Sequence, residues 1–167
     1  PLGRVAAPRA LGDSAALVLD FLRRQFTPEG GARDRAGKAD LYYTIFVLAG
    51  LGTFGPIVVA LRASVRSFLA RFGEGAELDF IHLGALARCW AAIGNVPEDL
   101  PDRVLGRIEE FRTPDGGYDP ERGATRGNAY GCFVAFGAYQ DLGRQAPDPL
   151  RMVQCLKLLE TPDHAWG

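Results

Sequence analysis

TPDGGY, at Thr113–Tyr118, is the stretch of this sequence that best defines its architecture. It follows a predicted amphipathic helix and precedes an apolar one. Related strings are TPEGG (Thr27–Gly31), FGEGAE (Phe72–Glu77) and TPDHAWG (Thr161–Gly167), and the steps between successive turns are 45, 41 and 48 residues. A period of about 40–50 residues is typical of repeat architectures. The sequence therefore predicts units of helix, Gly-rich turn and helix.

Individual residues in these turns carry further expectations. Gly116 and Gly117 lack a Cβ atom, so both are expected to adopt positive φ and let the chain reverse sharply. Tyr118 is expected to pack across the turn onto the next hairpin. His164 replaces the first Gly of the last turn, and we interpret it as a turn variant.

Hydrophobic periodicity predicts helices nearly throughout, and no segment alternates as a strand would. Asp13 and Asp40 are suited to cap the first two helices. The predicted helices are Ser14–Phe26, Asp40–Leu51, Ile57–Phe72, Leu78–Ile93, Leu100–Phe111, Asn128–Leu142 and Pro149–Leu159. We therefore expect an all-α protein.

The length of 167 residues favours one domain, at about 150 residues for each domain. We expect repeats at 14–52, 57–94, 100–143 and 149–167, the last of them truncated. The apolar second helices align with one another at DLYYTIFVLAGL, DFIHLGALARCW and GNAYGCFVAFGA. In this register the equivalent residues are Tyr43, His82 and Tyr130, and likewise Asp40, Asp79 and Gly127.

Composition excludes several classes of protein. The formal net charge is −1, which argues against a nucleic-acid partner. The three cysteines, Cys89, Cys132 and Cys155, form no CxxC pair and are interpreted as small core residues with free thiols. Free thiols favour a reducing compartment, so we expect a cytoplasmic protein.

The segment Leu41–Leu61 holds 21 residues without a charge, which is long enough to span a bilayer. Gly55 and Pro56 interrupt it, together with Gly50 and Gly52, as a break between two helices would. We therefore predict two buried helices joined by a tight turn, with membrane contact that is at most peripheral.

The helix–TPDGGY–helix units resemble the repeats of the prenyltransferase and squalene-cyclase superfamily. Residues Thr27–Leu51 are especially similar to a repeat of protein prenyltransferase β subunits, and the resemblance extends from about Leu17 to Gly167. It implies an α/α toroid, in which inner helices surround an aromatic-lined cavity. This chain holds fewer hairpins than a closed ring, so the implied ring is incomplete here.

The resemblance implies an isoprenoid-related enzyme that performs prenyl transfer or terpenoid cyclisation. Two other functions stay open: a non-catalytic protein that binds an isoprenoid or another lipid-like molecule, and an assembly module completed by a second copy or by another chain. Zinc or magnesium is implied by the resemblance alone. The family's zinc-binding His falls on Tyr43, and neither its Asp-Gly-Cys ligand pattern nor a DxDD acid motif occurs, so the sequence itself predicts no metal site.

His82 and Asp79 are the candidate catalytic residues. His82 lies in a predicted buried helix and is suited to general acid–base chemistry or to metal binding. Asp79 precedes it by three residues, which places both side chains on one helix face. The structural alternatives are a core histidine, and an acidic residue stabilised by the helix dipole.

Aromatic residues on the second helices are the candidate binding residues for an isoprenoid. In the resembling family such residues bind hydrocarbon chains and stabilise carbocations through their π faces. The alternative for each is ordinary core packing. The set comprises Tyr42, Tyr43, Phe46, Phe80, Tyr130, Phe133 and Phe136.

A basic loop follows the first turn. Arg33, Arg35 and Lys38 stand where the resemblance implies contact with a diphosphate, and Arg binds such oxygens in a bidentate manner. The alternative is a solvated surface loop.

Overall fold

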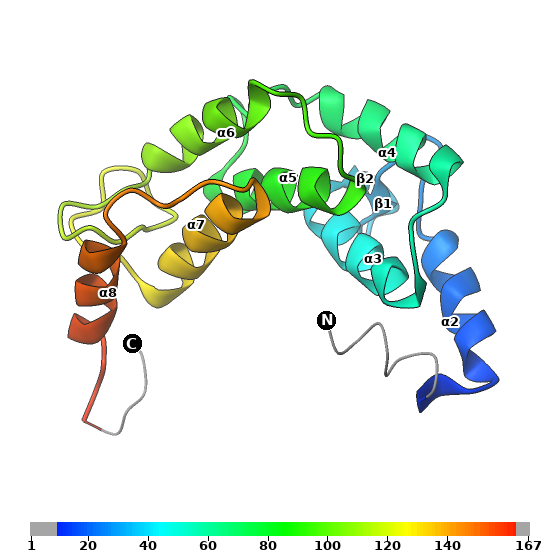
Figure 1. The fold of residues 1–167 in the computed structure, drawn as a ribbon, viewed down its shortest axis with the longest axis horizontal. Coiled ribbons are helices and arrows are strands. Elements are labelled where there is room, and N and C mark those ends of the chain that lie inside the picture. The colour runs from blue at the N-terminus through cyan, green and yellow to red at the C-terminus, as the bar shows by residue number, and fades with distance from the viewer. Residues whose placement is uncertain (1–9, 163–167) are drawn as a thin grey trace. The chain divides into compact units, whose positions relative to one another are not determined.

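The computed structural model describes residues 10–162, which form seven helices and two short strands (Figure 1). The helices are α2 (Ser14–Arg23), α3 (Leu41–Phe54), α4 (Val59–Ala70), α5 (Phe80–Ile93), α6 (Leu100–Glu109), α7 (Ala129–Asp141) and α8 (Pro149–Leu158). The all-α class is confirmed, and each helix ends within three residues of its predicted bounds. The prediction of no strand was wrong in one place, because β1 (Ala32–Arg33) and β2 (Ala39–Asp40) form an antiparallel pair.

The described residues form two compact units. The first contains the chain up to Gly73 together with Cys89–Asn95, and the second contains Glu74–Arg88 together with the chain from Val96. Helices α2, α3 and α4 belong to the first unit, and α6, α7 and α8 belong to the second. Helix α5 contributes its beginning to the second unit and its end to the first.

The two TPxGG turns have the same backbone conformation. The N–H of Thr27 donates to the carbonyl of Gly31 at 2.8 Å, and the N–H of Gly30 donates to the carbonyl of Thr27 at 3.0 Å. The same two bonds recur 86 residues later in the turn at 113–117, at 3.0 Å each. Gly30 has a φ of +96° and its counterpart Gly116 has +88°, a region that favours glycine. The two TPxGG turns therefore share one conformation, whereas in FGEGAE, which lies between them, the N–H of Phe72 donates instead to the carbonyl of Leu69 at 3.1 Å.

Helix α4 packs directly onto the first turn. A Cβ atom at Gly30 would lie 2.3 Å from the carbonyl oxygen of Ser64, and one at Gly31 would lie 2.6 Å from the ring of Phe68. Both glycines are therefore needed for this close approach as well as for the turn.

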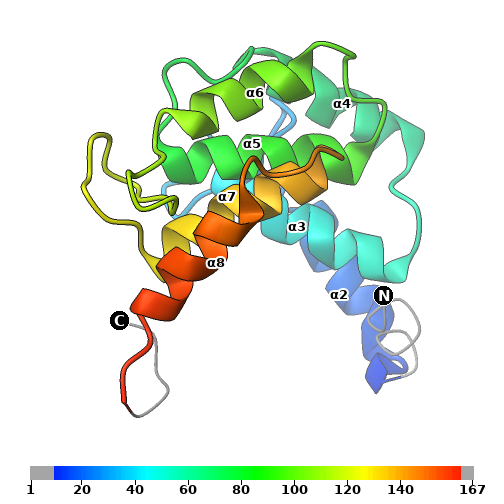
Figure 2. The ribbon, with the colours of Figure 1, turned by 60° about the vertical axis from the view of Figure 1, so that its left-hand side comes forward.

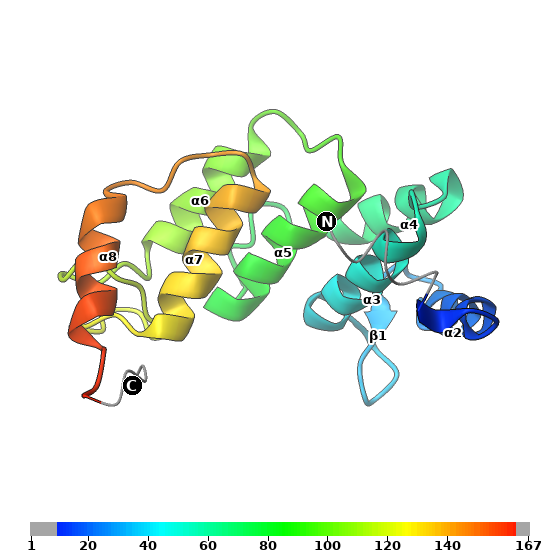
Figure 3. The ribbon, with the colours of Figure 1, turned by 60° about the horizontal axis from the view of Figure 1, so that its bottom comes forward.

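Helix α8 packs onto the second turn in the same way, and it lies beside α7 (Figures 2 and 3). A Cβ atom at Gly116 would lie 2.5 Å from that of Arg151, and one at Gly117 would lie 2.4 Å from the Sγ of Cys155. Gly117 does not have the predicted positive φ. It is glycine because α8 leaves no space for a side chain.

Side-chain caps fix where α3 and α7 begin. Asp40 accepts a hydrogen bond from the N–H of Tyr43 at 2.9 Å, and Asn128 accepts one from the N–H of Gly131 at 2.6 Å. Asp13 occupies the N-cap position of α2, as predicted, but its side chain makes no capping hydrogen bond.

The caps also correct the register predicted for the repeat. Asn128, and not Gly127, occupies the position of Asp40. Tyr130 therefore corresponds to Tyr42, one residue before its predicted partner. The difference arises because the sequence register aligned tyrosines, whereas the capping hydrogen bond determines the helix start.

The uncharged segment at residues 41–61 forms parts of two helices, as predicted. The prediction that both helices are buried was wrong in part, because Phe46 on α3 and Val59 on α4 are 57% and 81% exposed. Helix α3 ends at Phe54, Gly55 and Pro56 follow, and α4 begins at Val59. Among the described residues, no helix combines the length and the apolar character needed to cross a membrane.

We predict that Gly30→Ala lowers the free energy of unfolding by about 3 kcal/mol, because it adds a backbone clash to an unfavourable φ. Gly37→Ala is the matched control, since Gly37 has a φ of +83° but has open space where a Cβ would stand. The control should lose only about 1 kcal/mol. Urea denaturation measures both losses, and equal losses would contradict the packing described for the first turn.

Candidate functional site

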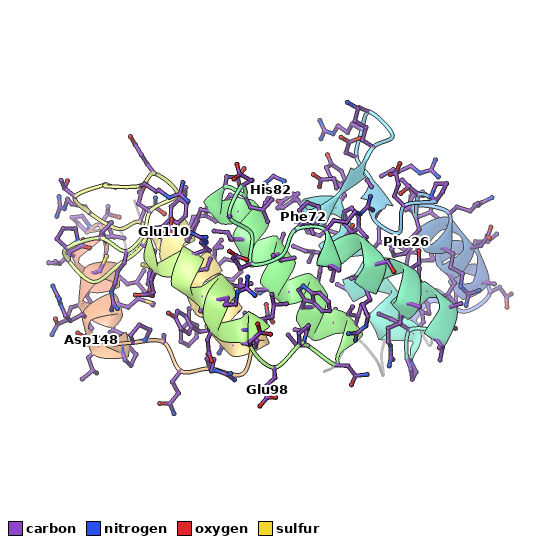
Figure 4. All side chains as sticks on the ribbon, turned by 90° about the horizontal axis from the view of Figure 1, so that it is seen from above. Phe26, Phe72, His82, Glu98, Glu110 and Asp148 are labelled. Carbon is purple, nitrogen blue, oxygen red and sulfur yellow. The ribbon has the colours of Figure 1, made fainter. Side chains whose placement is uncertain are left out.

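His82 and Asp79 are in contact at the beginning of α5, and Figure 4 shows His82 at this end of the helix. Oδ1 of Asp79 accepts a hydrogen bond from the backbone N–H of His82 at 2.9 Å. Both carboxylate oxygens also lie 2.9 Å from Nδ1 of His82. The two residues therefore share a helix face, as their spacing indicated.

The electrostatics of this pair are those of a helix cap. Burial disfavours the charged form of Asp79, but hydrogen bonds from the backbone and ring of His82, together with its charge, outweigh burial and lower the pKa of Asp79. A carboxylate at a helix N-terminus is further favoured by the helix dipole. The pair therefore has a structural role in starting α5, whatever further role His82 has.

Metal binding needs more ligands than this pair supplies. A zinc site uses at least three protein ligands, and residues 10–162 contain no group of three or more His, Cys, Asp or Glu side chains arranged to hold a metal ion. His164 lies outside the described residues.

Helix α7 exposes a row of aromatic side chains. Tyr130, Phe133 and Phe136 have 49%, 62% and 43% of their surface exposed. Their spacing of three residues places them along one side of the helix, while Ala135 and Tyr139 are buried on another side. We call Tyr130, Phe133 and Phe136 the α7 aromatic face.

Helix α3 has a smaller aromatic face, made of Tyr42 and Phe46. Their rings meet edge to face, with centroids 5.0 Å apart, and 57% of the surface of Phe46 is exposed. Val47 and Leu51 are buried in the core of the first unit. In the corrected register, Tyr42 and Tyr130 are equivalent residues of the two copies, and both are exposed.

Two of the predicted binding residues face the core instead. Tyr43 packs against the buried cluster that contains Ala32 and Val47. Phe80 is completely buried, and its ring lies 4.9 Å from that of Phe111. Tyr43 and Phe80 are therefore core-packing residues, which was the alternative interpretation for each of them.

The basic loop after the first turn is partly engaged within the first unit. Arg33 donates hydrogen bonds to the carbonyl oxygens of Arg24 and Gln25, at 2.8 and 3.4 Å. These contacts satisfy carbonyls just beyond α2. All three basic residues of the loop, Arg33, Arg35 and Lys38, are exposed, and the hydrogen bonds hold Arg33 at the end of α2.

A small apolar pocket of about 90 Å³ in the first unit was not predicted. Leu19, Leu51 and Leu61 line it from three different helices, together with Arg23 and Phe54. Its lining does not include the α3 aromatic face. No local motif could have indicated it, because it depends on the packing of the three helices.

Sequence reasoning also missed a polar cluster inside the second unit. Oε1 of Glu109 accepts hydrogen bonds from the hydroxyl of Tyr118 and, at 2.7 Å, from that of Tyr139. Burial, reinforced by the contact with Glu109, raises the pKa of both phenols. The hydroxyl of Tyr118 thus binds α6, the helix that precedes its own turn, a contact that the sequence analysis did not predict.

No protein-family model, curated protein or solved structure matches this chain. The class of the protein therefore rests on its own features: it is an all-α protein with two copies of a helix, a TPxGG turn and two further helices.

We predict that Asp79→Ala lowers the free energy of unfolding by about 1 kcal/mol. Asp79→Asn should keep most of the stabilisation that Asp79 contributes, because Asn also caps helices. The ionised Asp79 has a lowered pKa in the folded protein. Its contribution is therefore present above its unfolded pKa, near pH 4, and is lost as the pH falls through the folded value.

Urea unfolding of the native protein and of D79A at pH 7 and near pH 2.5 measures this contribution. The free energies of unfolding of the two proteins should differ less at the lower pH. A difference that stays constant or widens contradicts the assignment of Asp79 as a charged cap.

Proposed function

We propose that this chain is a helical-repeat protein of the α/α-toroid type that binds an isoprenoid, or a similar lipid-like chain, on its aromatic faces. The observation that carries the proposal is the α7 aromatic face: Tyr130, Phe133 and Phe136 stand exposed in a row on a helix whose other side is buried.

The physical chemistry of these side chains suits a hydrocarbon ligand. Covering a Phe side chain that is half exposed to water contributes about 1 kcal/mol, and several in a row add their contributions along an extended chain. Aromatic faces also attract the double bonds and any developing cation of an isoprenoid. The α3 aromatic face offers the same chemistry in the first unit.

Prenyl transfer and terpenoid cyclisation belong to this proposal as the reactions that the sequence resemblance implies. Both need an acid or a metal beside the hydrocarbon. His82 and Asp79 are the candidate acid–base residues. The hydrogen bonds between them are those of a helix cap, so the capping role is tested before a catalytic one. Binding therefore stands first in the proposal and catalysis second.

We predict that the protein binds a dansyl-labelled geranylgeranyl alcohol. Phe133→Ala should weaken binding at the α7 aromatic face about fivefold, and Phe46→Ala should weaken binding at the α3 aromatic face to the same extent, a loss of about 1 kcal/mol each. A fluorescence titration measures the dissociation constants. Phe21→Ala is the matched control, because Phe21 on α2 has the same exposed fraction as Phe46, 57%.

The control should leave the affinity unchanged. Equal weakening by all three variants would show nonspecific adsorption, and no binding by the native protein would contradict the proposed function.

Assembly is the second candidate function, and one observation favours it. Helix α8 exposes Leu150 and Leu158, at 75% and 70%, and Val153 lies between them along the helix and is also exposed. Apolar residues gathered on one helix are typical of a contact with another protein surface.

If α8 mediates assembly, sedimentation velocity should show an oligomer that the double variant L150E/L158E dissociates. Val59→Glu, at an exposed valine on α4, is the control and should leave the oligomer intact. A native protein that sediments as a monomer at every concentration contradicts this candidate.

A further inference from the structure

Two buried thiols meet beneath the second turn. Cys132 comes from α7 and Cys155 from α8, and each has only 1% of its surface exposed. A Cβ atom at Gly117 would lie 2.4 Å from the Sγ of Cys155 and 3.3 Å from the Sγ of Cys132. Both sulfurs therefore occupy the space that the missing side chain of Gly117 leaves.

The first unit shows that this packing does not require cysteine. At the place of Cys132 it has Thr44, whose Oγ1 accepts a hydrogen bond from the N–H of Ala32 at 2.8 Å. In the second unit the counterpart of this N–H is that of Tyr118, which favours the thiolate of Cys132 against the effect of burial. At the place of Cys155 the first unit has Phe68, which packs under its own turn.

Two residues that differ between the copies are thus both cysteine in the second unit, and both of their sulfurs lie against Gly117. A hydroxyl and a phenyl ring meet the same packing demands in the first unit. What the cysteine pair adds is the chemistry of two neighbouring thiols.

We propose that Cys132 and Cys155 form a reversible disulfide, which ties α8 to α7 beneath the TPDGG turn when the protein meets a peroxide. Both residues lie against Gly117, and their helices are neighbours (Figure 3). This proposal is independent of ligand binding at the aromatic faces.

The surroundings assign different roles to the two sulfurs. Burial raises the pKa of Cys132, and the backbone N–H of Tyr118 offsets part of this rise because it stabilises the thiolate. The thiol of Cys155 instead donates to Oδ2 of Asp115 at 3.5 Å, which holds its proton in place. Burial, with the charges of Cys132 and Asp115, raises the pKa of Cys155 to about 12. Cys132 is therefore the attacking sulfur and Cys155 the resolving one.

The reaction balances with hydrogen peroxide as the oxidant. The thiolate of Cys132 attacks one oxygen, the O–O bond breaks, and the released hydroxide takes up a proton to become water. The sulfur of Cys155 then attacks the resulting sulfenic acid, its proton is lost, and the S–O bond breaks to release a second water. The two thiols lose two electrons and two protons, and a thiol reductant reverses the change.

The test treats the full reduced chain with hydrogen peroxide and measures its intact mass. The mass should fall by about two hydrogens and recover with dithiothreitol. Trypsin places the cysteines in separate peptides, 127–144 for Cys132 and 152–157 for Cys155, and these should appear linked. The disulfide should raise the melting temperature by about 8 °C.

Three variants make the result specific. Cys89→Ala is the control, because Cys89 is buried in the first unit with its thiol 3.7 Å from the carbonyl of Leu41, and this variant should still form the link. Cys155→Ser should abolish it. Cys132→Thr, which copies the first unit and keeps the hydrogen-bond acceptor, should fold normally and also abolish it.

Links that involve Cys89, links between two chains, or oxidation of the cysteines to sulfinic acid without a link would each overturn the proposal. So would an unchanged mass in the folded native protein under peroxide concentrations that oxidise the urea-denatured chain.

Discussion

The close approach of a helix to a glycine pair is the interaction on which both units depend. In each TPxGG turn the first glycine takes a left-handed conformation, and both glycines leave space for the third helix of the repeat, α4 in one unit and α8 in the other. A side chain at Gly30 or Gly116 would meet Ser64 or Arg151 before the helix could dock. The same contact therefore determines the turn, the position of the third helix and the strongest feature of the sequence repeat.

The two copies share this framework and differ in what fills it. The first unit places Ala32 after its turn, whereas the second places Tyr118, whose phenol joins Tyr139 on the carboxylate of Glu109. Beneath the turns, Thr44 and Phe68 in one copy correspond to the two thiols of the other. The two turns thus have the same backbone conformation but are surrounded by different side chains. The second unit holds both the larger aromatic face and the thiol pair.

Features that follow from local sequence could be predicted. The helices follow from periodicity, the break at Gly55 and Pro56 from residue type, and the Asp40 cap from its place before an apolar run. Features that depend on tertiary contacts could not. The equivalence of Tyr130 with Tyr42 is a local feature that the sequence register missed, because that register aligned tyrosines and not the two capping residues, Asp40 and Asn128. The burial of Phe80, and the polar cluster around Glu109, depend on helices distant in sequence.

The aromatic faces of α3 and α7 carry the functional proposal, and photo-crosslinking tests it most directly. A geranylgeranyl alcohol with a diazirine group would be irradiated with the native protein, and the adducts mapped after trypsin digestion. The account predicts adducts in peptides 39–62 and 127–144, which contain α3 and α7. Excess unlabelled geranylgeraniol should suppress them. Adducts concentrated in peptides 10–23 and 152–157, from α2 and α8, or adducts that the competitor does not reduce, would contradict it.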